Sequence, residues 1–151
     1  MNREERTLVL LKPGCLHRGL VGEIIHRFEA KGLKIIGLKM ISLPKPKLEE
    51  FYSVHKGKPF FEGLIEFMAK GPLIAFVLQG PSCVKVVRDM VGATDFLEAQ
   101  PGTIRGDYSL SIRKNLVHAA DSPEAAANEI SLLFDEDEIQ EWSSPISDYV
   151  Y

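Results

Sequence analysis

RKNLVHAADSPEAAANE, residues 113–129, joins an expected strand to an expected helix and places a histidine between them. The apolar pair before His118 has polar neighbours, which predicts a short buried strand that carries the imidazole at its end. Ser122 can cap a helix, Pro123 fits the first helical position, and the alanines that follow favour a helix to about residue 133. A histidine in such a place is usually structural. An asparagine three residues before it and an acid three residues after it favour a functional role.

Length and composition favour a single domain, residues 1–151. The chain is 45% hydrophobic and 26% charged, as is typical of soluble globular proteins. Its net charge of −3 argues against nucleic acid as the primary partner, because duplex DNA is bound by a basic surface. No apolar run approaches the roughly 20 residues that span a membrane, and the start, MNREERTLVLL, does not resemble a signal peptide. The two cysteines form no disulfide or metal pattern, so we expect a cytoplasmic protein.

Apolar runs and helical periodicity predict the other elements. Strands are expected at 7–11, 33–43 and 73–78, and helices at about 20–31, 48–54, 60–70 and 82–91. Gly80 and Pro81 are expected to form a turn. Residues 93–113 show no clear period, and a loop of this length in a compact domain is usually functional or disordered. The tail carries Trp142, Tyr149 and Tyr151, which we expect to be covered from solvent.

The order of these elements predicts the fold class. Without its insertions the order is βαββαβ, the ferredoxin-like α+β plan of a four-stranded antiparallel sheet with helices packed on it. This chain is expected to have a long loop and a C-terminal tail in addition to these elements. It serves many unrelated functions, so the fold alone fixes no activity.

The residues around His118 suit chemistry on phosphate. A neutral histidine is a nucleophile, and phosphoryl transfer needs positive charge and positioning more than covalent machinery. Lys12, Arg88 and Arg105 are candidates for that charge, although the lysine can equally snorkel to solvent and the arginines can be solvated or form surface salt bridges. The segment KPGCLHRGL has glycines but lacks the Gly-Lys-Ser/Thr ending of a P-loop.

Several longer segments resemble the nucleoside diphosphate kinase family, from about residue 5 to the C-terminus. They are ERTLVLLKP, RGLVGEIIHRFEAKGLKIIGLKM, PFFEGLIEFM, the Gly-Pro pair at 71–72, PGTIRGDYS and NLVHAADS. Several of them are specific on their own, and their order leaves little room for chance. The resemblance implies that His118 takes the γ-phosphate of a nucleoside triphosphate, usually ATP, and passes it to a nucleoside diphosphate in a ping-pong reaction.

The resemblance also implies roles for the other site residues. Lys12 and Asn115 would bind the ribose 3′-hydroxyl and nearby phosphate oxygens, and Arg88, Thr94 and Arg105 would bind the phosphates. Tyr52 would lie near the transferred phosphoryl group, and Glu129 would orient the imidazole. Phe60 would stack on the base beside Leu64 and Ile112, and Asp121 would help to hold Mg²⁺ through water. The phosphates would hold most of the metal's remaining positions. Because every base has a π-face, stacking predicts broad base tolerance.

The residues alone permit plainer roles. These are core packing for Tyr52, Phe60 and Leu64, an ordinary apolar position for Ile112, a turn or strand edge for Asn115, a loop hydroxyl for Thr94, a helix cap for Asp121 and a solvated helix position for Glu129. His17, His26 and His55 match no position of the family pattern, so we expect structural or surface roles for them.

Two departures from the family pattern bear on activity. Ala120 stands where the family usually has a serine that hydrogen-bonds within the His–Glu arrangement, so we expect lowered turnover but not inactivity. Gly14 and Cys15 stand where the family usually has Asp-Gly. A position with positive φ tolerates cysteine poorly unless Gly14 takes over that geometry, so the placement of Lys12 depends on the backbone at Gly14 and Cys15. Cys15 could also be redox-sensitive, although nothing in the sequence indicates a lowered thiol pKa.

The aromatic tail and the long loop suggest a homo-oligomer. Members of the family are commonly hexamers and some bacterial members are tetramers; the long C-terminal segment favours a hexamer here. The two departures leave one alternative function, a catalytically weak or silent nucleotide-binding or scaffolding homologue.

Overall fold

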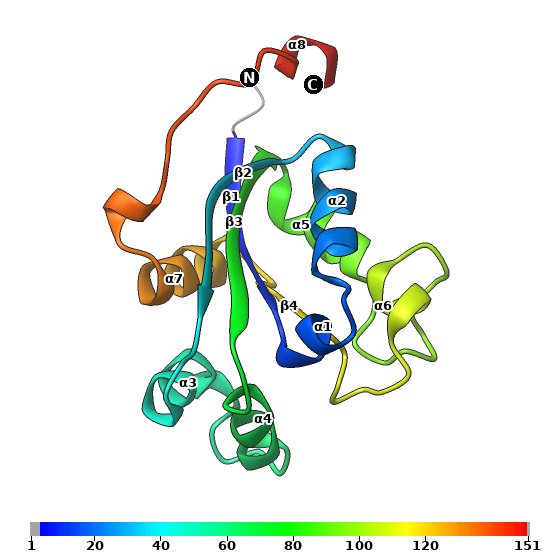
Figure 1. Cartoon of the computed structure of the whole chain (residues 1–151), viewed down its shortest axis with the longest axis vertical. Helices are drawn as coiled ribbons and strands as arrows, with labels where there is room; N and C mark the ends of the chain where they lie inside the picture. Colours follow the sequence, from blue (N-terminus) through cyan, green and yellow to red (C-terminus); the bar gives the residue numbers. More distant parts are fainter. Residues whose placement is uncertain (1–3, 151) are drawn as a thin grey trace.

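Figure 1 shows the computed structural model of the chain, which describes residues 4–150. The strands are β1 (Glu4–Leu11), β2 (Lys34–Ile41), β3 (Leu73–Pro81) and β4 (Val117–Ala119). The helices are α1 (Pro13–His17), α2 (Val21–Lys31), α3 (Lys45–Phe51), α4 (Phe61–Met68), α5 (Cys83–Val91), α6 (Ile104–Tyr108), α7 (Pro123–Leu133) and α8 (Ser147–Val150), with 3-10 turns at Ser53–His55 and Glu136–Glu138.

The four strands form one sheet in the order β2-β3-β1-β4, and every neighbouring pair is antiparallel. This order confirms the predicted ferredoxin-like plan. The short strand β4 lies at one edge, where His118 pairs with Leu10 of the central strand β1. Backbone hydrogen bonds to β1 therefore fix the position of the His118 backbone at the sheet edge and the direction of its side chain.

Helices cover both faces of the sheet, which explains why β1 ends in the buried apolar run of residues 8–11. Val9 and Leu11 face α2 and α5, whereas Leu8 and Leu10 face the cluster built from α3, α4 and α7. Figure 1 shows α2 and α5 on one side of the sheet and α7 on the other. Two apolar layers thus hold the rigid frame from which the site residues project.

Some boundaries differ from the prediction. β1 begins earlier than residue 7, β3 runs through the expected Gly80-Pro81 turn, and α3 lies at residues 45–51 instead of 48–54. α3 begins earlier because Pro46 lies in its first turn, where a proline costs no hydrogen bond. The short helices α1 and α6 were not predicted, since five residues are too few to show a helical period.

The aromatic tail is less covered than expected. Trp142 is 47% exposed, and its indole N–H donates to the carbonyl of Ile35 at 2.9 Å. Tyr149 is 88% exposed, so the expectation that it is covered is wrong for this chain on its own. Tyr151 lies outside the described residues. Across residues 4–150, no helix has both the length and the apolar character needed to cross a membrane.

Candidate active site

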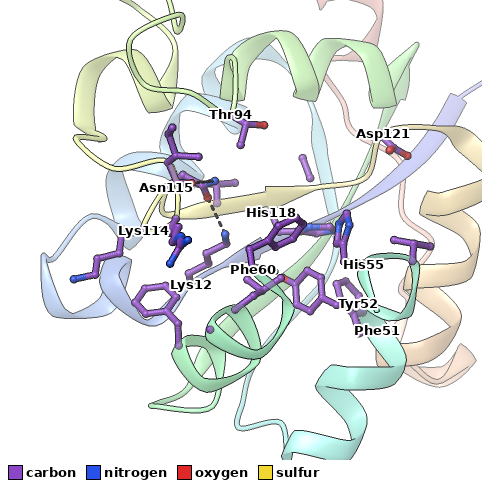
Figure 2. Close-up of a pocket in the computed structure, with 18 of the residues that line it drawn as sticks. Lys12, Phe51, Tyr52, His55, Phe60, Thr94, Lys114, Asn115, His118 and Asp121 are labelled. Atoms are coloured by element: carbon purple, nitrogen blue, oxygen red, sulfur yellow. Dashed lines mark hydrogen bonds between the residues drawn. The ribbon is translucent and has the colours of Figure 1, made fainter. Parts of the chain in front are cut away.

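One cavity of about 1060 Å³ opens beside β4 (Figure 2). Its lining includes every residue to which the sequence assigned a site role: Lys12, Tyr52, Phe60, Leu64, Arg88, Thr94, Arg105, Ile112, Asn115, His118, Asp121 and Glu129. They come from segments as far apart as Lys12, directly after β1, and Glu129 in α7, and the fold brings them together. The volume is at the upper limit of the range for small-molecule sites.

The ring of His118 is held by a carboxylate. Its Nε2 hydrogen-bonds to Oε1 of Glu129, and both side chains are largely buried. Because an ionised carboxylate only accepts hydrogen bonds, a neutral His118 carries its proton on Nε2 and its lone pair on Nδ1. The ring is therefore fixed in the tautomer that makes Nδ1 the nucleophilic atom.

Glu129 is positioned by the start of α7. The hydroxyl of Ser122 accepts from the backbone N–H of Ala125 at 3.0 Å, and Pro123 occupies the first turn. This confirms the predicted cap. Glu129 lies seven residues after the cap, which is about two helical turns, so it projects from the same side of the helix towards His118.

Two aromatic rings pack against the imidazole. Phe51 and Tyr52 meet His118 edge-on, with ring centroids 5.1 and 5.6 Å from it. The Tyr52 hydroxyl is buried and has no hydrogen-bond partner among residues 4–150. Burial, and then the charge of Glu129, raise the pKa of Tyr52, so the hydroxyl remains a donor. A buried donor without a partner beside a nucleophile is suited to a ligand oxygen.

Two arginines line the cavity near β4. Arg105 is buried and donates to the carbonyls of Gly92 at 2.9 Å and Val117 at 2.8 Å. Arg88 of α5 donates to the carbonyl of Ala119 at 3.2 Å. Burial first, and then the neighbouring Arg88 charge, lower the pKa of Arg105 to about 10. Both guanidinium groups are thus held by backbone on either side of His118.

Lys12 adds a third cation at the end of β1. It is buried, and its Nζ donates to Oδ1 of Asn115 at 2.8 Å, the dashed line in Figure 2. Burial, and then the charge of Arg105, lower the pKa of Lys12 to about 8. Within residues 4–150, neither Lys12, Arg88 nor Arg105 forms an ion pair with a carboxylate. The cavity therefore concentrates uncompensated positive charge, which favours a polyanionic ligand.

The rim of the cavity is more exposed. Phe60 and Ile112 keep much of their apolar surface in solvent, and Leu64 is half-buried beside them. Thr94 and Asp121 are also exposed. The rim can thus offer an apolar slot that leads to the cationic interior.

Comparison with known proteins identifies the family. The family model for nucleoside diphosphate kinase matches residues 5–139. The chain belongs to the nucleoside diphosphate kinase family. Membership identifies it as a phosphotransferase.

Relatives match the chain along most of its length. It is 63% identical over 138 residues to a nucleoside diphosphate kinase of Staphylothermus marinus, which covers 91% of this chain and 98% of the relative. It is 53% identical over 139 residues to that of Thermoplasma acidophilum, with 92% and 94% covered. A solved nucleoside diphosphate kinase from Halobacterium salinarum, in complex with CDP, superposes with a TM-score of 0.96 at 43% identity and 99% coverage of both chains.

The departure at Gly14 and Cys15 is compatible with the family fold. Both residues lie in α1, and neither has a positive φ. The concern that a cysteine would be strained here is therefore wrong, because helical backbone accepts any side chain of that size. Burial raises the pKa of the Cys15 thiol to about 12, which makes it a poor redox sensor.

His55 also lines the cavity, although the sequence suggested only a structural or surface role. Its ring lies 5.2 Å from Phe60 and 6.4 Å from Tyr52 between centroids. Burial and the charges of Lys58 and His118 lower its pKa, against the effect of Asp121. His55 follows α3 in a 3-10 turn, where no period could have linked it to the site; its position three residues after Tyr52 was the available signal.

Proposed function

We propose that the protein transfers the γ-phosphate of a nucleoside triphosphate, usually ATP, to a nucleoside diphosphate through a phosphohistidine at His118. The observation that carries this proposal is a single arrangement: a ring held by Glu129, with its lone pair on Nδ1, beside three buried or half-buried cations that have no acidic partner within residues 4–150. Such a site combines a nucleophile with the charge needed to bind phosphates.

The proposed reaction has two symmetrical halves. Nδ1 of His118 attacks the γ-phosphorus; the new N–P bond forms while the bond to the bridging oxygen breaks, and the nucleoside diphosphate leaves. A second nucleoside diphosphate then attacks the same phosphorus with its terminal oxygen and regenerates the imidazole. Glu129 keeps the Nε2 proton and stabilises the positive charge of the phosphorylated ring.

The other residues are proposed to bind and orient the nucleotide. Arg88, Arg105 and Thr94 would hold the phosphates, and Tyr52 would donate to the transferred phosphoryl group. Lys12 and Asn115, which already hydrogen-bond to each other, would contact the ribose 3′-hydroxyl and nearby phosphate oxygens.

Phe60, Leu64 and Ile112 are proposed to take the base between apolar surfaces. Stacking on a π-face does not distinguish between bases, so broad acceptor tolerance is expected. The CDP complex of the Halobacterium relative supports a pyrimidine in a site of this kind.

Magnesium is proposed to bind with the nucleotide. No cluster of three or more acidic, histidine or cysteine side chains within residues 4–150 could hold a metal alone. Asp121 is one exposed carboxylate on the cavity wall, which fits an ion that keeps its waters and takes most ligands from phosphates. When bound, the ion would neutralise phosphate charge during transfer.

Radiolabelling tests the proposal directly. Incubation with γ-labelled ATP should give a phosphoprotein that is labile in acid and stable in base, and a folded His118→Ala variant should take up no label. The alternative, a silent nucleotide-binding or scaffolding homologue, predicts nucleotide binding without label. This alternative rests on the two departures from the family pattern, at Ala120 and at Gly14-Cys15. The backbone of Cys15 has no positive φ, so the second departure introduces no strain at that residue.

We also propose a cytoplasmic homo-oligomer, with a hexamer favoured over a tetramer. Leu38 and Met40 on the edge strand β2, and Leu97 and Leu110 in the long loop, expose apolar side chains that an interface would cover. The cytoplasmic location rests on the two cysteines, whose spacing matches no disulfide framework or metal motif. Light scattering of the purified protein would give the number of subunits.

A further inference from the structure

A strained turn precedes the strand that carries His118. The N–H of Val117 donates to the carbonyl of Asn115 at 2.9 Å, and the single residue between them, Leu116, has a φ of 75°. This is a three-residue γ-turn of the rare form with a positive central φ, which a branched side chain adopts only under constraint. The turn sets the direction of Asn115, whose side chain reaches Lys12.

Two donors from the start of α1 hold the centre of this turn. The Leu116 carbonyl accepts from the backbone N–H of Lys12 at 2.9 Å and from the thiol of Cys15 at 3.0 Å. Leu116 itself is buried. Strained backbone persists only where its surroundings determine it, so both donors contribute to the geometry of the turn.

Cys15 is suited to donate at this position. Its side chain is fully buried, and its raised pKa keeps the sulfur protonated near neutral pH. A thiolate could not donate, and a glycine, which the family usually has here, offers no side-chain donor at all. The cysteine thus supplies a contact that depends on this chain's own sequence.

We propose that Cys15 is a positioning residue for nucleotide binding: its thiol, by donating to the Leu116 carbonyl, holds the γ-turn that places Asn115 against Lys12. Cys15 touches no substrate and acts through Asn115. The inference rests on the proposed function, in which Asn115 and Lys12 contact the ribose 3′-hydroxyl.

Cys83 provides a matched control. It is fully buried in the same apolar cluster as Cys15, and its thiol donates no hydrogen bond within residues 4–150. Cys83→Ala therefore removes a buried sulfur without loosening the turn, while Cys15→Ala removes the sulfur and the donor together. Cys15→Ser retains a hydroxyl donor.

Steady-state kinetics with these variants test the inference. Cys15→Ala should raise the KM for a nucleoside diphosphate by about threefold or more relative to Cys83→Ala, with kcat little changed, and Cys15→Ser should recover most of the loss. With a 3′-deoxy acceptor the difference between the two alanine variants should shrink, because the Lys12–Asn115 pair then lacks its hydroxyl partner. Equal KM values for both alanine variants, or a serine variant as weak as alanine, would overturn the proposal.

A spectroscopic measurement covers the case in which Cys15→Ala does not fold. The chain has two cysteines, so Cys83→Ala leaves Cys15 as its one thiol. Its infrared S–H stretching band should lie below that of a thiol without an acceptor, and a band at the unbonded position would overturn the proposal. A wild type that exchanges no phosphate would instead defeat the proposed function, whereas the KM comparison among active variants concerns Cys15 alone.

Discussion

At the scale of single residues, Lys12 shows how the site opposes stability. Its ammonium is buried with a hydrogen bond to Asn115 but without a carboxylate partner among residues 4–150, and burial lowers its pKa from 10.5 to about 8. Because the pKa of Lys12 is lower in the folded protein than in the unfolded chain, folding below pH 8 must bury a charge that the unfolded chain keeps in water. This cost decreases as the pH rises from about 8 towards 10.5.

Lys12→Met should therefore stabilise the protein at pH 7, by about 1–3 kcal/mol in the free energy of unfolding, while lowering kcat/KM at least about tenfold. Urea denaturation at pH 7 and at pH 10 measures the free energy of unfolding. The difference in that free energy between the variant and the wild type should be smaller at pH 10. Lys56→Met, at an exposed position, serves as the control. A Lys12→Met variant less stable than wild type at pH 7 would contradict the electrostatic argument.

Ala120 offers a second test at this scale. It is fully buried in a small apolar cluster with Val84 and Ala126. Ala126 lies in α7, one turn before Glu129. If a serine hydroxyl here reaches the His–Glu pair, Ala120→Ser should raise kcat about twofold to tenfold without loss of stability.

Ala126→Ser is the matched control for that variant, because it buries a hydroxyl in the same cluster. It should lower the melting temperature with no gain in kcat, since a buried hydroxyl without a partner is destabilising. An Ala120→Ser variant that behaves in the same way would refute the idea that a serine improves the orientation of His118.

At the scale of elements, the segment between α5 and β4 places Arg105 through a close backbone approach. Arg105 lies in α6, whose first turn is capped by the Thr103 hydroxyl, which accepts from Gly106 N–H at 3.0 Å. A Cβ on Gly106 would overlap the carbonyl oxygen of Gln100, and backbone cannot move aside as a flexible side chain can. The glycine is therefore required for the position of the neighbouring arginine.

Gly106→Ala should lower the free energy of unfolding by about 1–3 kcal/mol and raise the KM for nucleotides, because Arg105 is displaced with the helix. Gly22→Ala, in an open position of α2, should instead leave KM unchanged and stabilise slightly. Thermal unfolding and initial rates distinguish the two. A Gly106→Ala variant with unchanged KM would mean that α6 does not determine the placement of Arg105.

The predictability of each element follows from its physics. β1 and β3 each contain an unbroken apolar run that is buried on both faces, and Ser122 and Pro123 predict the start of α7. The helices α1 and α6 have five residues each, which is too few to show a helical period. The prediction of backbone strain at Cys15 was wrong because it did not include the helix α1, in which Cys15 lies.

The site was predictable mainly through family resemblance. Composition and spacing singled out His118 and its cations, but they left Phe60 and Tyr52 as core residues. The bond between Lys12 and Asn115 joins residues 103 positions apart, which no local pattern reveals. The position of His55 in the cavity was not predicted, because His55 lies in a 3-10 turn after a short helix and no local sequence pattern connects it to the site.

At the scale of the whole molecule, the sheet and its two helical layers bring His118 and three cationic side chains to one cavity. His118 is tied to β1 through strand pairing and to α7 through Glu129. In the proposed reaction, one imidazole nitrogen carries the phosphoryl group between two nucleotides.

A chase of the isolated phosphoenzyme tests that claim most directly. The protein is labelled with γ-³²P-ATP, freed of nucleotide and mixed with an unlabelled nucleoside diphosphate in a rapid-quench apparatus. The predicted result is that the label leaves His118 and appears in the nucleoside triphosphate at a rate at least equal to kcat. Label that remains on the protein, or leaves more slowly than the enzyme turns over, would contradict the mechanism.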